Sequence, residues 1–489
     1  MPTPHRLAVP ALLAALALLS ACSTAPVGAP VPAPVSAPSS PSGPTTGEPA
    51  PGPQPEATQP PVGTLPPPAP TPAPTPLPAP TPRPAPAPAP APTSPTLPPL
   101  PPLPPAPPAP APAAPVSALD VLEVALRVLP PNLAQRRGWA EDLATSFAAL
   151  SIPAQPHKVC ALAAVIEQES TWQADPPVAG LAKIAKAELD KKRARYGIPK
   201  PVFDLAMAKK SPTGRSYQQR LDALRTEREL SDLFEDMIRE VPFGTKLFEG
   251  QNPVRTGGAT QVSVAFAAQQ MRERPYPWRP AGSPREEVFK RRGALYFGAA
   301  MLLEHPVSYN RMLYRFADYN GGRYSSRNAA VQSLLAQLTG QAIAPDGDLL
   351  RYQAGEPLSP RSAPSQAWRA LLTIQGALGL TSAQIEQDLK LEKRFEFEQS
   401  LTYRRLYQLA ERRGLKPARE QLPDIELHSP KITRPLSTAW FAERCEARYR
   451  ACLARDPYAA PSHGSAASAA AATPTTSAPL PASSGDARP

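Results

Sequence analysis

The stretch VIEQESTWQADP, residues 165–176, carries two glutamates at the end of a hydrophobic run. At about 100° per residue, a helix places Glu169 on the same apolar stripe as Val165 and Ile166, and Glu167 on the opposite side. An inward carboxyl at a helix C-terminus loses hydration and meets the negative end of the helix dipole, so its pKa is expected to rise. A carboxyl protonated near neutral pH can act as a general acid. The alternative is structural, with Glu169 bonded to a backbone amide or paired with an arginine across the core.

The elements that position this carboxyl are expected to be helices, because the chain from Ser117 to Asp456 repeats apolar residues at helical spacing. We predict helices over residues 118–129, 138–150, 157–170, 181–196, 216–241, 283–305, 310–320 and 381–391. Ser283 and Glu286 have capping-box spacing and mark one helix start. Thr381 and Gln384 mark another. No run of alternating residues predicts a sheet, so the fold class is mostly α.

Four motifs in this region follow one another in an order that resembles the lysozyme-like soluble lytic transglycosylases, bacterial enzymes that cleave peptidoglycan. They are Glu169-Ser170 with Trp172 and Pro176; Gly257, Gly258, Gln261 and Val262 in GGATQVS; Gly293, Tyr296 and Phe297 in RRGALYFG; and Ala317, Tyr319, Asn320 and Gly322 in ADYNGG. The whole chain also has a looser likeness to outer-membrane lipoproteins of Gram-negative bacteria. The resemblance implies a lysozyme-like helical domain.

The resemblance also implies roles for individual residues. Glu169 would protonate the glycosidic oxygen and then act as base on the sugar's own 6-hydroxyl, giving an anhydro product without metal or cofactor. Gln261 and Asn320 would bind sugar substituents, and Tyr319 would orient Glu169 or the substrate. Each has a structural alternative: Gln261 as a helix N-terminal residue, Asn320 as a turn former and Tyr319 as core packing. Ser170, placed with the substrate-binding group, is equally a helix-end hydroxyl.

Two features depart from the family's pattern. A charged helical stretch, residues 180–250, separates the first two motifs and is interpreted as an inserted subdomain that shapes the cleft or blocks it. Asp318 replaces a residue that is usually alanine, placing a charge near the site. The leading hypothesis is therefore a peptidoglycan lytic transglycosylase. The alternatives are a catalytically inactive cell-wall-binding protein, or an interaction lipoprotein whose basic subdomain, around Lys191, Lys192 and Arg193, docks another envelope protein.

The N-terminus predicts export and a lipid anchor. Residues 1–21 combine Arg6, an apolar run far shorter than the ~20 residues of a bilayer helix, and small residues before Cys22. LSAC resembles the lipobox of bacterial lipoproteins, in which Cys22 is lipidated; the alternative is a plain secretory signal cut elsewhere. By the same resemblance, Ser23 favours the outer membrane, with the folded domain in the periplasm.

Low-complexity segments flank the folded part. Residues 22–116 are mostly Ala, Pro, Ser and Thr and are predicted to form a disordered tether that could span up to roughly 290 Å, and a second such tail covers 457–489. All but three of the basic and three of the acidic residues lie between them, so the net charge of +11 belongs to the helical domain, 117–456. This charge favours an anionic partner such as cell-wall glycan or a lipid surface. The exported compartment, rather than the charge, disfavours nucleic acid.

The cysteines leave their pairing open. Cys445 and Cys452, seven positions apart on a helical pattern, would lie about 10 Å apart, too far for a disulfide within one helix. One of them could pair with Cys160 and clamp the C-terminal helix to the helix that carries Glu169; buried free thiols are the alternative. No His or Cys cluster accompanies them to predict a metal site.

Overall fold

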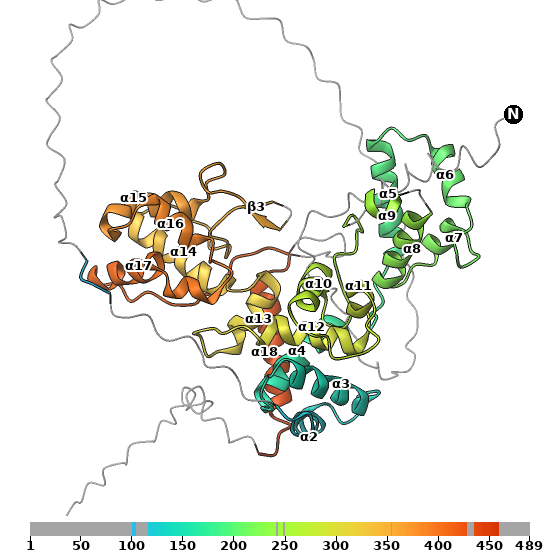
Figure 1. Cartoon of the computed structure of the whole chain (residues 1–489), viewed down its shortest axis with the longest axis horizontal. Coiled ribbons are helices and arrows are strands. Elements are labelled where there is room, and N and C mark those ends of the chain that lie inside the picture. The colour runs from blue at the N-terminus through green and yellow to red at the C-terminus, as the bar shows by residue number, and fades with distance from the viewer. Residues whose placement is uncertain are drawn as a thin grey trace, which may run out of the picture. The chain divides into compact units, whose positions relative to one another are not determined.

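The computed structural model describes residues 100–103, 116–240, 243–247, 250–353, 355–427 and 435–458. The predicted signal peptide, Cys22, nearly all of the tether and almost the whole tail lie outside these residues. Within them the chain is mostly helical, as predicted (Figure 1). No helix in these ranges is both long and apolar enough to cross a membrane.

The helices are α2 (Ala118–Val128), α3 (Arg136–Ala149), α4 (Pro156–Ser170), α5 (Leu181–Arg195), α6 (Lys200–Ala208), α7 (Tyr217–Asp222), α8 (Glu227–Arg239), α9 (Gly244–Leu247), α10 (Val264–Glu273), α11 (Pro284–Val288), α12 (Arg291–Leu303), α13 (Met312–Gly321), α14 (Ser325–Thr339), α15 (Gln366–Leu378), α16 (Ser382–Leu389), the 3₁₀ helix η1 (Phe395–Gln399), α17 (Leu401–Arg412) and α18 (Thr438–Leu453). Strands β1 (Thr256–Gly257) and β2 (Val262–Ser263) form one antiparallel pair, and β3 (Tyr352–Gln353) and β4 (Glu356–Pro357) form another.

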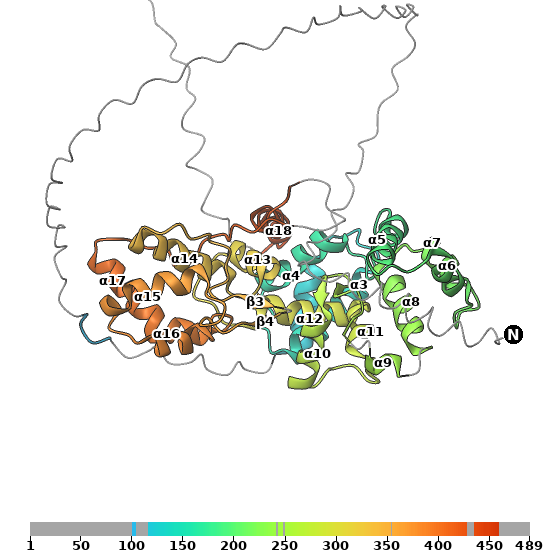
Figure 2. The same cartoon turned by 90° about the horizontal axis from the view of Figure 1, so that it is seen from above.

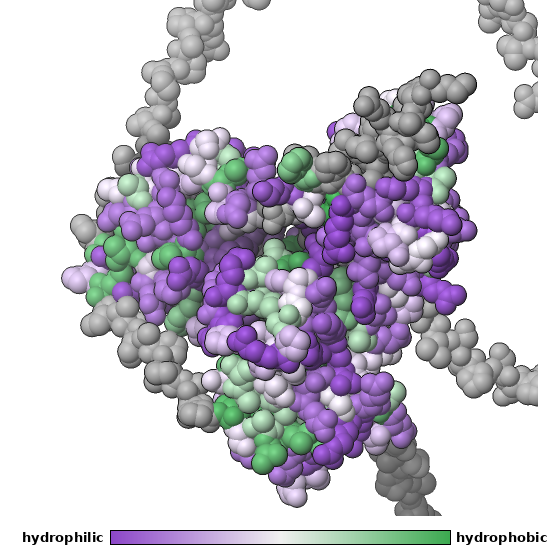
Figure 3. Space-filling model, turned by 45° about the vertical axis from the view of Figure 1, so that its right-hand side comes forward, coloured by the Kyte–Doolittle hydropathy of each residue, from purple (hydrophilic) through white to green (hydrophobic). Residues whose placement is uncertain are grey.

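Within the described ranges, buried apolar residues form three clusters. The central cluster joins α2, α3, α4, α10, α12, α13 and α18. A second, the insertion cluster, lies between Val178 and Ile238 and is built from α5 to α8. A third, the C-terminal cluster, lies between Val331 and Ala410 and is built from α14 to α17 (Figure 2). On the face in Figure 3, hydrophilic side chains predominate and apolar ones gather in small groups.

The C-terminal helix α18 completes the central cluster by packing against α4 and α13. A disulfide between Cys160 on α4 and Cys452 on α18 links residues 292 positions apart. Cys445, also on α18, is a buried free thiol. Both alternatives that the sequence left open therefore occur on α18: Cys452 forms the disulfide, and Cys445 is a buried free thiol.

Two predicted helices are broken. Residues 283–305 begin with the predicted capping box at Ser283 and Glu286, but form α11 and α12 with a bend at Phe289 and Lys290. At this bend the Val288 backbone lies close to Gly258. A Cβ on Gly258, whose φ is +72°, would lie 1.9 Å from the Val288 carbonyl oxygen. Residues 216–241 likewise divide into α7 and α8, because Thr226 starts a new capping box.

A short piece of the tether contacts the C-terminal cluster. Leu100 packs against it, and the Pro101 carbonyl accepts hydrogen bonds from Arg405 Nη1 at 2.6 Å and Gln408 Nε2 at 3.3 Å. Both side chains act as donors in these contacts, so the acceptor that they hold on the tether is a backbone carbonyl.

Candidate functional site

Glu169 lies in the last turn of α4, with 4% of its surface exposed. Glu167, two residues earlier, has a side chain that is 38% exposed. The helical period therefore predicted the directions of both carboxylates correctly. Ser170 Oγ donates to the Ile166 carbonyl at 2.9 Å, which is the helix-end role considered for it.

Tyr319 on α13 connects this helix end to the β1–β2 turn. Its hydroxyl donates to the Thr260 carbonyl at 2.6 Å. Burial first, and the nearby Glu169 carboxylate second, raise the pKa of the Tyr319 hydroxyl well above its usual value. Three segments, at positions 169, 260 and 319, therefore meet at one place.

The β1–β2 turn is seated on α12. Thr260 Oγ1 donates to the Ala294 carbonyl at 2.8 Å, and a Cβ on Gly298 would lie 2.7 Å from the Thr260 methyl group. A small residue at 298 lets the turn approach the helix closely. The GGATQVS and RRGALYFG motifs therefore belong to one packed unit.

Gln261, at the end of this turn, is held by the insertion. Its Nε2 donates to Glu227 Oε2 on α8 at 3.0 Å, and its Oε1 accepts from Thr256 Oγ1 at 3.3 Å. Gln261 and Glu227 are only 9% and 7% exposed. We did not predict Glu227 as a site residue; its signal was the capping-box spacing of Thr226 and Glu229, which begins a helix at position 227.

The segment after α4 holds this part of the insertion close to Glu169. Thr226 Oγ1 donates to Asp175 Oδ2 at 3.0 Å, and the Val178 amide donates to the Arg225 carbonyl at 2.8 Å. A single β-bridge pairs Pro177 with Thr226. The insertion is thus fixed at the end of α4 as well as at Gln261.

The other two polar residues of the ADYNGG motif face different elements. Asn320 Oδ1 accepts from Thr438 Oγ1 on α18 at 2.7 Å, so its contact is with α18 rather than with the hairpin turn. Asp318 is buried and accepts hydrogen bonds from Tyr309, Ser325 and Ser326 at the start of α14. The expectation that Asp318 places a charge near the site is therefore wrong, because its partners lie on the α14 side of α13.

Helix α18 lies along the end of α4. Arg444 Nε donates to Gln168 Oε1 at 3.3 Å. Burial, and then the nearby Glu169 carboxylate, raise the pKa of the Cys445 thiol on α18 well above its usual value. Cys445 is therefore a neighbour of Glu169 that sequence reasoning missed, because nothing local links positions 169 and 445.

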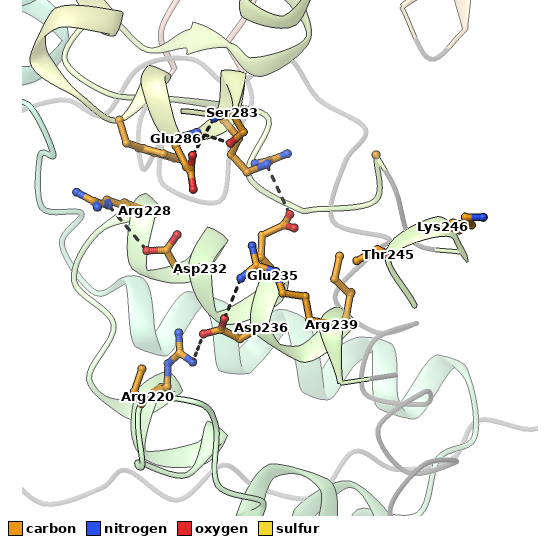
Figure 4. A pocket seen from close by; sticks show the side chains of 15 residues that line it. Arg220, Arg228, Asp232, Glu235, Asp236, Arg239, Thr245, Lys246, Ser283 and Glu286 are labelled. Atoms are coloured by element: carbon orange, nitrogen blue, oxygen red, sulfur yellow. Dashed lines mark hydrogen bonds and ion pairs between the residues drawn. The ribbon is translucent and has the colours of Figure 1, made fainter. Parts of the chain in front are cut away.

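A cavity of about 740 Å³ lies between α8 and the start of α11 (Figure 4). Charged side chains of both signs line it and pair with one another: Arg220 with Asp236 at 2.6 Å, Arg285 with Glu235 at 3.6 Å and Arg228 with Asp232 at 3.8 Å. The cavity therefore offers many hydrogen-bonding groups whose charges are largely compensated.

The basic stretch suggested for protein docking is not a uniform surface. Lys191 is exposed, whereas Lys192 is only 6% exposed. Arg193 is half-buried, and its Nη1 donates to the Ile198 carbonyl at 3.0 Å. Of the three, only Lys191 is free of a described structural role. Among the described residues, no group of three or more His, Cys, Asp or Glu is arranged to hold a metal ion.

The fold and site define a mostly helical protein with a buried glutamate at the junction of a helix end, a hairpin turn and an inserted subdomain. The chain belongs to the family described as "Protein of unknown function (DUF1615)", which matches residues 132–455. It is also 45% identical over 331 residues to the Uncharacterized protein YaiW of Escherichia coli (strain K12), an alignment that covers 68% of this chain and 88% of that protein. No solved structure matches the chain.

Proposed function

We propose that this protein is a lipid-anchored, lysozyme-like enzyme of the cell envelope that cleaves the glycan strands of peptidoglycan. The observation that carries the proposal is the meeting of Glu169, the Thr260–Gln261 turn and Tyr319 at the end of α4. These residues come from three of the four motifs that resemble the soluble lytic transglycosylases, and they are far apart in the sequence. The proposed anchor is Cys22, with the folded domain in the periplasm at the outer membrane.

In the proposed reaction, Glu169 gives its proton to the glycosidic oxygen as the bond from that oxygen to the sugar C1 breaks. The 6-hydroxyl of the same sugar then bonds to C1 and returns its proton to Glu169, so no water is consumed. Tyr319 acts as a positioning residue, since its bond to Thr260 fixes the turn beside the carboxyl. The paired charges of the cavity on α8 offer hydrogen bonds to sugar hydroxyls, and their charges largely cancel.

A second candidate is a protein that binds wall glycan without cleaving it. The contact between Glu227 and Gln261 favours it, because the insertion occupies a hydrogen-bonding group that the resemblance assigns to substrate. Glu169 and Ser170 are also only 4% and 5% exposed. A glycan strand can bond to Gln261 in the proposed way only if Glu227 on α8 gives up its hydrogen bond.

The test incubates the whole chain with peptidoglycan sacculi and analyses the soluble products by mass spectrometry. The wild type should release anhydro-sugar muropeptides, Glu169→Gln should release none, and Glu167→Gln, on the opposite side of the same helix, should match the wild type. Glu227→Ala, which frees Gln261, should release at least as much product as the wild type.

Other outcomes separate the two candidates. Product from Glu227→Ala alone would mean an enzyme closed by its insertion. If no variant releases product but all sediment with sacculi, the wall-binding candidate replaces the enzyme. If the protein neither cleaves nor sediments with sacculi, both proposals fail and a partner protein in the envelope becomes the hypothesis to pursue.

A further inference from the structure

A second, smaller cavity of about 280 Å³ lies near the C-terminal end of α12. It is lined by His305, Pro306, Arg323, Tyr324, Lys393, Arg394, Phe395, Glu396 and Gln399. Three of these side chains are cations and one is an anion. The cavity shares no residue with the Glu169 site, so what it binds does not depend on the proposed glycan chemistry.

His305 is the buried polar group of this cavity. It is 8% exposed, and among the described residues neither ring nitrogen makes a hydrogen bond of good geometry, although the Met301 backbone lies close enough to interact weakly with the ring. Burial, and then the charges of Arg323, Arg315 and Arg327, lower the pKa of His305 well below its usual value, and the Met301 backbone opposes this more weakly. A buried polar group that is not fully hydrogen-bonded costs about 1–3 kcal/mol, so a ligand that bonds to the ring nitrogens would recover part of this free energy.

Arg323 brings a fixed positive charge to the same wall. Its Nη2 donates to the Ala300 carbonyl at 2.8 Å, and its guanidinium lies 5.0 Å from the centre of the Phe266 ring. These contacts leave Nε, which is buried and has no hydrogen-bond partner among the described residues. A cation held by the last turn of a helix and by an aromatic ring is preorganised.

Lys393 and Arg394, in the segment before η1, add two further positive charges to the lining. Arg394 pairs with Glu396 at 3.5 Å, and both side chains are more than half exposed. Lys393 pairs with Asp348, which does not line the cavity. An exposed ion pair such as Arg394–Glu396 contributes little stability, so Arg394 can turn toward a stronger anion at small cost. Lys393, whose side chain is 31% exposed, would exchange its contacts with Asp348 and the Gly347 carbonyl for the anion.

We propose that this cavity binds a phosphate group, either as inorganic phosphate or as the phosphomonoester of a lipid headgroup. Phosphate presents four oxygens in a tetrahedron, which suits donors that reach the cavity from Arg323, Lys393, Arg394 and the His305 ring. A carboxylate has two oxygens in one plane and would leave part of this set unused. Charge-assisted hydrogen bonds are about twice as strong as neutral ones, which makes a dianion the best match for these donors.

The test titrates the whole chain with inorganic phosphate by calorimetry and follows the ring resonances of His305 by NMR, where the chain has only five histidines to assign. The double variant Lys393→Gln/Arg394→Gln should weaken phosphate binding tenfold or more. The matched control Arg369→Gln/Lys416→Gln removes the same charges from exposed positions outside the cavity and should bind within twofold of the wild type. His305→Gln, if it folds, should also weaken binding.

The source of the phosphate is decided by a second arm, flotation with phosphatidylcholine vesicles that contain phosphatidic acid. Saturable binding of inorganic phosphate with a shift of His305 supports a site for the free ion. Flotation that the double variant loses and the control retains supports a lipid headgroup, whether or not the free ion binds. Equal affinity for acetate, an unchanged His305 resonance, or equal binding by the double variant and its control would overturn the proposal.

Discussion

Glu287 stabilises the bend between α11 and α12 at the scale of a single residue. It is fully buried and accepts hydrogen bonds from Arg292, Lys290, Tyr276 and the Gly282 amide. Burial alone would raise the pKa of the Glu287 carboxyl, but these donors outweigh it and lower the pKa to about 2. We expect Glu287→Gln to lower the free energy of unfolding by about 3 kcal/mol near neutral pH. This is the lower end for a broken buried ion pair, because Arg292 and Lys290 are partly exposed.

The pH dependence of this effect has a definite sign. Because the folded pKa lies below the ordinary value of 4.5, the stabilisation is complete above 4.5 and is lost as the pH falls toward 2. Urea unfolding of the wild type and of Glu287→Gln should therefore converge in acid. Glu443→Gln, at an exposed position on α18, is the control and should change stability little at any pH. Curves that stay equally far apart in acid would refute the assignment.

Asp318 should show the opposite sign. Burial raises its pKa to about 6, against the opposing hydrogen bonds from Ser326 and Ser325. The folded state then binds the proton more tightly than the unfolded state, so the contribution is complete below the ordinary value of 3.8 and declines as the pH rises through 6. The difference in unfolding free energy between wild type and Asp318→Asn should fall by roughly 3 kcal/mol from about pH 3 to about pH 7. A pH-independent difference, measured by the same urea titrations, would contradict this.

Local rules predicted residue directions and helix starts. Helical periodicity was enough to direct Glu169 inward, and the predicted capping boxes at Ser283 and Thr381 begin α11 and α16. The break at Phe289 was missed because its cause is tertiary: the β1–β2 turn at Gly258 lies against the Val288 carbonyl. The bond between Glu227 and Gln261 was missed for the same reason, since it joins the insertion to a motif 34 positions away.

At the scale of elements, the disulfide fixes α18 against the end of α4. Cys160→Ser/Cys452→Ser should lower the free energy of unfolding by about 2–4 kcal/mol, as is typical for loss of a native disulfide. Local release of α18 should also expose Cys445, which is completely buried in the wild type. Mass spectrometry should therefore detect faster alkylation of Cys445 in the double variant under native conditions. An unchanged alkylation rate would show that packing alone holds the helix.

At the scale of the whole molecule, the central cluster is assembled from discontinuous sequence. Its helices come from residues 118–170, 264–321 and 438–453, and the insertion and C-terminal clusters are built from the stretches between them. An inserted subdomain over residues 180–250 is predicted from the sequence, but a separate C-terminal cluster is not, because helical periodicity shows that a face is buried without showing against which partner. The Cys160–Cys452 disulfide joins the first and last of these three parts, and both intervening stretches lie between the two cysteines in the sequence.

This arrangement predicts that the three clusters lose structure separately. Phe234 in the insertion cluster, Phe397 in the C-terminal cluster and Phe316 in the central cluster are each at most 1% exposed, and Phe→Ala at such sites costs about 3–5 kcal/mol. In hydrogen–deuterium exchange read by mass spectrometry, Phe234→Ala should speed exchange in α5 to α8, and Phe397→Ala should speed it in α14 to α17. Phe316→Ala should act mainly on α4, α12, α13 and α18. If Phe234→Ala sped exchange equally in all three clusters, the described core would be one cooperative unit and the insertion could not open alone to admit a glycan strand.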